Sequence, residues 1–198
     1  MYFIYLLAQL LLLCAWRTSK EISLLFGQIC SNLPTNDQIE NLSSFFIQQL
    51  AEIRHRGAFE QAFAGFCQIC GFIWKQESLN DYPIKLLEKT LNDLKENESN
   101  TRFCATRRSA GIPYLIQALV TTEPKTRNFQ SLELALNHLL SFCEDPREEL
   151  RIHAYNILRS LYRDSSLGEV VSPYISKGLQ VSILGFKAST WPVSQNIY

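Results

Sequence analysis

The sequence predicts an all-α protein, a HEAT/armadillo-like helical solenoid segment made of antiparallel helix pairs that spans residues 1–198 as a single region. Apolar residues recur at helical spacing along the chain, whereas the Asn-Gly and Asp-Gly turns that join alternating strands do not occur. The expected helices pair at intervals of roughly 40 residues, and several are apolar on two faces. Stacking buries a helix on both sides, so a solenoid is favoured over a globular bundle, although no literal repeat is found.

The first expected helix is the apolar run of residues 1–16, which is interrupted by Gln9 and ends at Arg17. A secretory signal begins with positive residues, and a membrane span needs roughly 18 apolar residues, so the run matches neither. We expect a buried solenoid helix here in preference to a signal or a membrane anchor. The helix continues over residues 22–29, and Pro34 ends it because proline disfavours the helical conformation of the preceding residue.

The next two helices are predicted from a capping pattern and an apolar stripe. Thr35 opens a sequence of capping-box form. The stripe that follows is Ile39, Leu42, Phe46, Leu50 and Ile53. The helix is expected to end at Gly57 in a left-handed cap, with Arg54 and Arg56 complementing the negative end of its dipole. Residues 58–74 are apolar nearly all round, which predicts a helix buried on several sides.

Further helices are predicted over residues 84–94, 102–119, 129–142, 150–162 and 170–186. Within the second of these, Gly111 and Pro113 are expected to bend or restart the helix. Asp145, Pro146 and Glu148 stand in the order of an N-cap, an N1 proline and an N3 glutamate. The acidic residues around Asp145 are therefore interpreted as a charged helix start and not as paired catalytic carboxylates.

Composition limits the function classes. The chain has 19 basic and 19 acidic side chains, so it lacks the long-range field of a self-sufficient nucleic-acid binder, and any RNA contact must use a local patch. Its six cysteines lie in apolar helical stretches, which favours a reduced, intracellular compartment over a disulfide scaffold.

Motifs for catalysis are missing from the sequence. It contains no Gly-x-Gly turn, phosphate loop, nucleophile elbow or His-Glu-x-x-His zinc helix. The single CxxC, Cys67 to Cys70, lacks a second ligand pair, so we interpret it as two core cysteines and expect no metal. His153 is interpreted as a packed or hydrogen-bonded histidine. We therefore expect a protein without enzymatic activity or a cofactor.

The basic stretch Thr101-Arg-Phe-Cys-Ala-Thr-Arg-Arg-Ser-Ala-Gly-Ile-Pro113 resembles a signature of the THADA family. Three more stretches resemble the family in the same order, at residues 15–27, 55–66 and 153–168. After Trp191 the sequence departs from the family, which usually continues with an Arg-Asn pair and another helix.

This resemblance implies an armadillo-type fold that is an internal segment of a longer solenoid. It also implies a cytoplasmic, non-catalytic partner of a separate tRNA 2′-O-ribose methyltransferase that acts at position 32 of the anticodon loop. The implied partners are the catalytic subunit and tRNA, with no membrane and no small-molecule cofactor. A scaffold that binds proteins without an RNA role is the alternative.

Arginines are the candidates for contact with RNA or a partner protein, because guanidinium groups bind phosphate bidentately and stay charged. The candidates are Arg54, Arg56, Arg102, Arg107, Arg108, Arg159 and Arg163. Each could instead pair with acidic side chains of adjacent helices, and Asp164 is close enough in sequence to pair with Arg159 or Arg163. The structural candidates are Gly57, Gly111 and Pro113, the last two fixing the angle at which the basic stretch is presented.

Overall fold

The protein is all-α in the computed structural model, which describes residues 2–32, 35–53, 55–96 and 111–185. The α-helices are α1 (Tyr2–Ile29), α2 (Asn36–Glu52), α3 (Arg56–Ile73), α4 (Tyr82–Glu96), α5 (Ile112–Thr121), α6 (Gln130–Phe142), α7 (Glu148–Arg163), α8 (Gly168–Val171) and α9 (Ile175–Gly185). Short 3-10 turns lie at Cys30–Asn32, Lys125–Arg127, Ser165–Leu167 and Ser172–Tyr174. The prediction of fold class is confirmed.

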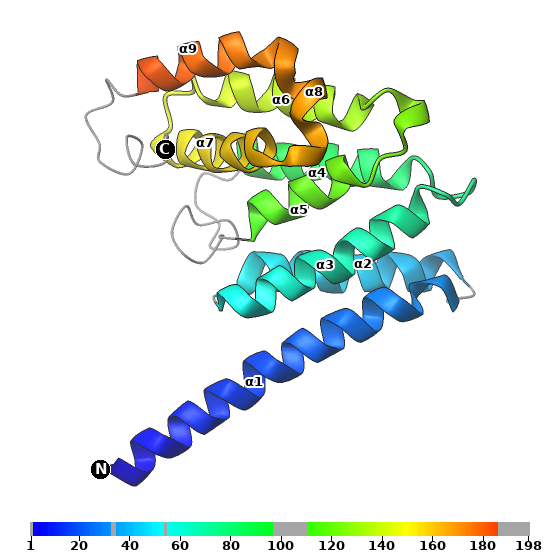
Figure 1. Ribbon diagram of the computed structural model, residues 1–198, viewed down its shortest axis with the longest axis vertical. Coiled ribbons are helices and arrows are strands. Elements are labelled where there is room, and N and C mark those ends of the chain that lie inside the picture. The colour runs from blue at the N-terminus through cyan, green and yellow to red at the C-terminus, as the bar shows by residue number, and fades with distance from the viewer. Residues whose placement is uncertain (1, 33–34, 54, 97–110, 186–198) are drawn as a thin grey trace.

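The helices stack as a segment of a solenoid (Figure 1). Helix α1 packs against α3, α3 against α5 and α5 against α7, so these four helices form one layer. Helices α2, α4 and α6 each pack against the odd-numbered helix that follows them, and α4 also contacts α6. The repeating unit is therefore a helix pair, as the sequence predicted, and its apolar faces are buried between neighbouring pairs.

One apolar cluster runs through the stack, from Cys30 in the 3-10 turn after α1 to Val181 in α9. The stripe predicted for α2 points into it, since Phe46 and Leu50 are fully buried. The stripe predicted for α6 is confirmed in full: Leu132, Ala135, Leu136, Leu139 and Leu140 are all buried. Burial of these side chains supplies the main driving force for the stack.

The N-termini of α2 and α6 are capped in two different ways, one by an adjacent residue and one by a residue several positions earlier in the chain. Thr35 caps α2 as predicted, since its hydroxyl oxygen accepts from the backbone N–H of Gln38 at 3.3 Å. Helix α6 is capped differently, by the buried carboxylate of Glu123, which accepts from the backbone N–H groups of Gln130 (3.0 Å) and Ser131 (2.9 Å). The Ser131 hydroxyl donates to the same carboxylate. An anion thus satisfies amides that helices leave unpaired at their N-termini.

Helices α1 and α3 approach closely because two glycines lie at their crossing. A Cβ atom on Gly65 would lie 2.3 Å from the carbonyl oxygen of Ser23 and 2.8 Å from the ring of Phe46. A Cβ atom on Gly27 would lie 2.8 Å from the Cα of Gly65. No other residue type fits at these positions unless the backbones separate.

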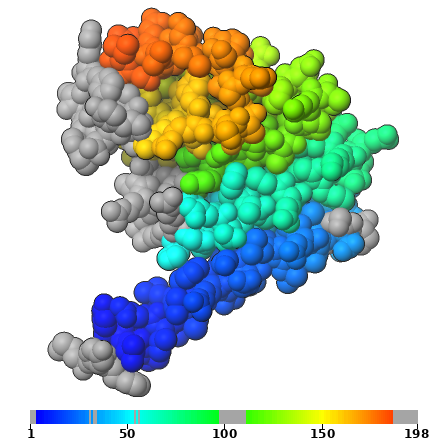
Figure 2. Space-filling view, viewed as in Figure 1, coloured from blue at the N-terminus to red at the C-terminus, as the bar shows by residue number. Residues whose placement is uncertain are grey.

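The expectation that residues 1–16 are buried is wrong for this chain. The run is helical, but it is continuous with residues 17–29 in one helix of 28 residues, α1. Its apolar side chains are exposed, from Ile4 (72%) to Leu12 (69%), and Figure 2 shows this part of α1 projecting from the rest of the molecule. No helix among the described residues is long and apolar enough to cross a membrane.

Candidate interaction surface

The structure places two of the seven candidate arginines on one exposed face. Arg159 and Arg163 lie one turn apart near the end of α7, and both are exposed. Neither forms a hydrogen bond or ion pair with another residue of the described ranges. Their guanidinium groups are therefore available to a ligand as far as the described part of the chain is concerned.

Asp164 pairs with neither arginine, contrary to the alternative raised by the sequence. Its carboxylate accepts from the side-chain amide of Gln117 on α5 at 2.5 Å and from the backbone N–H of Ser166 at 2.8 Å. Burial alone would raise the pKa of Asp164, but the hydrogen bonds from Ser166 and Gln117 outweigh it and lower the pKa below its usual value. The carboxylate that could neutralise the arginines is thus occupied elsewhere.

Gln117 joins α5 to α7 at two points. Besides donating to Asp164, its side-chain oxygen accepts from the hydroxyl of Ser160 at 2.7 Å. Ser160 lies next to Arg159 on the same helix, so the network fixes the part of α7 that carries the exposed arginines. Sequence reasoning missed Gln117, because its partners are 43 and 47 residues away and no local pattern marks them.

The prediction for the region around Gly57 is wrong. Helix α2 ends at Glu52, with Ile53 as C-cap, and α3 begins at Arg56. Gly57 lies in the first turn of α3, and none of the described glycines has a positive φ. Arg56 is the first residue of α3 and does not belong to the last turn of α2. Sequence alone placed the boundary late because residues 54–57 combine basic residues with glycine.

Gly111 and Pro113 were expected either to bend a helix or to restart one, and in the structure they lie at the start of α5. Gly111 is the N-cap of α5, and Pro113 lies within its first two positions, where proline costs no hydrogen bond. A Cβ atom on Gly111 would lie 2.0 Å from the carbonyl oxygen of Leu50, in the last turn of α2. This contact holds the start of α5 against α2.

Four of the remaining candidates, Arg54, Arg102, Arg107 and Arg108, lie outside the described residues. They stay predictions from the sequence. The described residues that flank the basic stretch are Glu96, which ends α4, and Gly111, the N-cap of α5.

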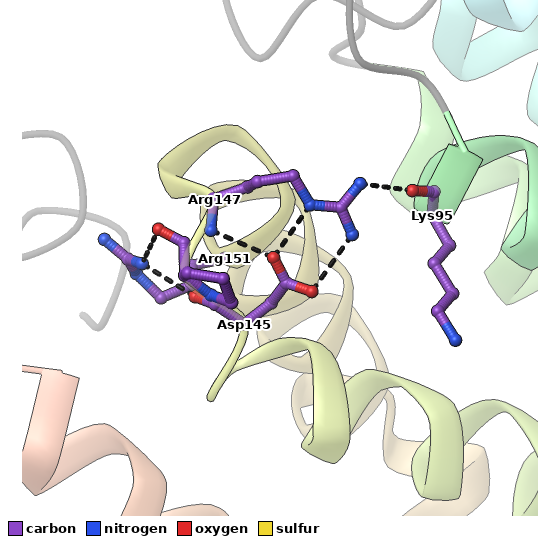
Figure 3. A network of polar contacts seen from close by, with 5 residues as sticks. Lys95, Asp145, Arg147 and Arg151 are labelled. Carbon is purple, nitrogen blue, oxygen red and sulfur yellow. Dashed lines mark hydrogen bonds and ion pairs between the residues drawn. The ribbon is translucent and has the colours of Figure 1, made fainter.

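A second polar network lies at the turn between α6 and α7 (Figure 3). The guanidinium group of Arg147 donates to both oxygens of Asp145, at 2.8 Å and 3.0 Å, and also to the carbonyl oxygen of Lys95 in the last turn of α4. Arg151 donates to the carbonyl oxygens of Asp145 (2.7 Å) and Pro146 (2.8 Å). The network ties the turn to the end of α4.

The predicted N-cap role of Asp145 is wrong. Helix α7 begins at Glu148 with Arg147 as its N-cap, two residues later than the pattern indicated. Asp145 accepts from the backbone N–H of Arg147 at 2.9 Å, so its oxygen braces the turn before the helix instead of the first helical turn. Glu148 and Glu149 do occupy the first turn, which confirms the interpretation of a charged helix start.

Acid is expected to weaken this turn. Hydrogen bonds from Arg147, joined by its positive charge, lower the pKa of Asp145 from 3.8 to about 2. Because the folded-state pKa lies below the unfolded one, the carboxylate stabilises the fold above pH 3.8, and that contribution is lost as the pH falls towards about 2. Asp145→Asn should therefore flatten the fall in melting temperature over this interval, measured by circular dichroism.

Asp93→Asn is the control, since Asp93 lies on α4 and forms no hydrogen bond or ion pair with another described residue. Its acid profile should match that of the unchanged protein. A steep acid dependence that persists in Asp145→Asn would contradict the role assigned to this carboxylate.

Cys67, Cys70 and His153 behave as packing residues. Cys70 is buried, and burial raises the pKa of the half-buried Cys67 to about 12, so both thiols stay protonated at neutral pH. No group of three or more His, Cys, Asp or Glu side chains that could hold a metal is found within the described ranges. His153 is buried in α7, in agreement with its interpretation as a packed residue.

An aromatic contact links α1 to the start of α3. Trp16 of α1 stacks on His55 with ring centroids 4.6 Å apart and planes 12° from parallel. The guanidinium carbon of Arg17 lies 5.9 Å from the Trp16 ring centroid. Trp16 is half-buried and His55 is exposed, so the region expected to be core is instead a partly open surface.

Comparison with known proteins gives consistent matches. The family model described as THADA/TRM732, DUF2428 matches residues 5–192. The chain is 41% identical to "tRNA (32-2'-O)-methyltransferase regulator THADA" of Gallus gallus and 38% identical to the Homo sapiens protein of that name. It is 29% identical to "tRNA (32-2'-O)-methyltransferase regulator trm732" of Schizosaccharomyces pombe.

Each of these matches covers 94% of the chain but only 11%, 10% and 13% of the respective relative. The chain thus spans about a tenth of the length of these proteins. No solved structure matches it significantly.

Proposed function

Because the chain belongs to the THADA/TRM732 family, we propose that it is a non-catalytic helical segment of a regulator that partners a tRNA 2′-O-ribose methyltransferase. The proposed target is position 32 of the anticodon loop, and the proposed site of action is the cytoplasm. The observation that carries the proposal is that relatives matched over 94% of the chain are named as regulators of a tRNA (32-2'-O)-methyltransferase.

The surface proposed for this role is the exposed face of α7 with Arg159 and Arg163. Two arginines at i and i+4 on one helix face offer paired donors to a phosphate or an acidic partner. The Gln117 network supports the proposal, since it keeps Asp164 from neutralising them. Arg107 and Arg108, with Arg102, are a second proposed contact that rests on the sequence resemblance alone.

The test is made in cells whose own gene for this protein carries Arg159→Ala and Arg163→Ala. Ribose methylation at position 32 is mapped in the anticodon loops, and co-purification with the methyltransferase is measured in parallel. We expect methylation to fall to about half or less, because each lost phosphate or carboxylate contact costs about 1 kcal/mol or more.

The matched control changes Lys85 and Lys89 to alanine. These two residues are exposed and lie four positions apart on α4, which is outside the layer formed by α1, α3, α5 and α7. Their replacement removes the same positive charge as the arginine variant. The control should leave methylation and co-purification unchanged. Equal effects of the two double variants, or none from the arginine variant, would count against the proposed surface.

The alternative is a scaffold that binds proteins only, which the formal net charge of zero favours. Mapping ribose methylation in cells that lack the whole protein separates the two functions. Full methylation at position 32 in such cells would replace the regulatory proposal with the scaffold.

A further inference from the structure

Ser166 lies just beyond the end of α7 that carries the exposed arginines. It is the second residue of the 3-10 turn Ser165–Leu167, and it is exposed. Its hydroxyl donates to Oδ1 of Asp164 at 2.5 Å, and its backbone N–H donates to the same oxygen at 2.8 Å. The other oxygen of this carboxylate accepts from Gln117 on α5. Ser166 is therefore the exposed member of the network that occupies Asp164.

The cations that lie closest to Ser166 in the chain are Arg163 and Arg159. Arg163 precedes Ser166 by three residues, and Arg159 lies one helical turn earlier. Both arginines are exposed and form no hydrogen bond or ion pair with another described residue. Three residues span about 10 Å at most, so a group attached to the Ser166 hydroxyl lies within reach of the long Arg163 side chain. An anion fixed on Ser166 would therefore have two unpaired guanidinium groups as its nearest cations in the chain.

The spacing of Arg163 and Ser166 suits modification by a protein kinase. An arginine three residues before a serine is read by kinases with an acidic substrate groove, because guanidinium groups form paired hydrogen bonds with carboxylates. Arg163 is the last residue of α7, and Asp164 is already extended, with φ −76° and ψ 116°. Helix ends fray, so a kinase needs to displace only this terminus and one side-chain cap. Ser165 is exposed as well, but Arg163 lies only two residues before it.

We propose that Ser166 is a phosphorylation site and that its phosphate prevents the surface formed by Arg159 and Arg163 from binding its partner. In this reaction the Ser166 hydroxyl oxygen forms a bond to the γ-phosphorus of ATP. The bond from that phosphorus to the oxygen of the β-phosphate breaks, ADP leaves, and the hydroxyl proton passes to the catalytic base of the kinase. The product carries a charge of about −1.5 to −2 at neutral pH.

The phosphate would have one anion and two cations as neighbours in the chain. It replaces a hydrogen-bond donor to Asp164 with a like charge, so repulsion disfavours that contact. Arg163 and Arg159 offer charge-assisted hydrogen bonds instead. Once they pair with the phosphate, their donors are no longer available to an external phosphate or carboxylate. This regulation rests on the proposed function of the surface, whereas the contact between phosphate and arginines does not.

The modification is tested by mapping phosphorylated residues with mass spectrometry. One sample of the protein is purified from its source cells in the presence of serine phosphatase inhibitors, and a second is incubated with ATP and an arginine-directed serine kinase. We expect phosphate on Ser166 in both samples, and none at this turn in a Ser166→Ala variant. A sample of either kind without phosphate on Ser166, or with phosphate on Ser165 instead, would overturn the proposal.

The contact with the arginines is tested by phosphorus NMR. Phosphoserine is placed at position 166 by genetic encoding, because Arg163→Ala also removes the residue that the kinase reads. The second pKa of the phosphate, ordinarily about 6, is obtained from a pH titration. Guanidinium groups favour the dianion, so we expect this pKa to be at least about half a unit lower than in the Arg159→Ala, Arg163→Ala variant.

The control for this titration is the variant with Lys85→Ala and Lys89→Ala, which removes the same charge from α4. It should leave the pKa of the phosphate unchanged. Equal pKa values with and without the arginines would show that the phosphate does not meet them and would reject the switch.

The consequence is tested in cells whose own gene carries Ser166→Glu. Ribose methylation at position 32 should fall by about half as much as in the arginine double variant, since glutamate carries one charge and the phosphate nearly two. Ser78→Glu adds the same charge at an exposed serine in the turn before α4 and should leave methylation unchanged.

The two proposals fail in different ways. A loss of methylation in the arginine variant without one in Ser166→Glu would overturn the switch and leave the proposed function standing. No loss in the arginine variant would reject the proposed function of the surface, and the pKa of the phosphate would still decide the contact.

Discussion

Replacing Gly65 with alanine is expected to lower the free energy of unfolding by about 2–3 kcal/mol, although alanine is the better helix former. The added methyl group would meet the Ser23 carbonyl oxygen at 2.3 Å and the ring of Phe46 at 2.8 Å. The first of these is a backbone atom of another helix, so relief requires α1 and α3 to separate. Urea unfolding followed by circular dichroism measures the loss.

Gly71→Ala is the matched control for this substitution. Gly71 lies in the same helix, and a Cβ atom there would meet nothing within 4 Å. Without a clash, the gain in helix propensity should stabilise the protein by about 0.5–1 kcal/mol. If the two variants shifted the urea midpoint in the same direction, close packing at the α1–α3 crossing would not be the cause.

The second large effect is expected at Glu123. Replacing it with alanine removes the acceptor for the backbone N–H groups of Gln130 and Ser131 and leaves them unpaired at the start of α6. The bond to Ser131 is buried and the bond to Gln130 is partly buried. A buried amide left unpaired costs about 1–3 kcal/mol, so we expect a loss of about 2–3 kcal/mol in unfolding free energy. Glu123→Gln keeps one acceptor oxygen and should lose about half as much.

Glu133→Ala serves as the control, because Glu133 is an exposed acidic residue in the first turn of the same helix. It contributes to the helix dipole alone, and its loss should cost a few tenths of a kcal/mol. A loss in Glu123→Ala no larger than in Glu133→Ala would show that the buried cap is not what stabilises α6.

Sequence patterns correctly predicted features that depend on residues close together in the chain. The cap at Thr35 and the stripe on α6 depend on residues three or four apart, and both appear as expected. The boundary at Gly57 failed because the helix dipole is a weak local preference, and α3 begins within the basic stretch although basic residues favour a helix end. The Asp145 pattern failed because a bidentate contact with Arg147 competed with capping.

Most features that the sequence did not predict depend on contacts between residues far apart in the chain. Nothing beside Glu123 in the sequence says that its carboxylate caps α6, and nothing beside Gln117 identifies Asp164 as its partner. Residues 4–13 are exposed because no helix among the described residues covers them, and apolar periodicity cannot reveal this. The family resemblance identified the basic stretch, but Arg102, Arg107 and Arg108 lie outside the described residues.

The two hydrogen bonds of Gln117, to Ser160 and to Asp164, fix the position of α7 before any partner binds. Helix α7 can neither slide along α5 nor rotate about its own axis without breaking the bond to Ser160 or the bond to Asp164. Whatever molecule meets Arg159 and Arg163 therefore encounters two cations on a prealigned backbone. Within this protein, association therefore requires the arginine side chains to be ordered, but not the helix that carries them.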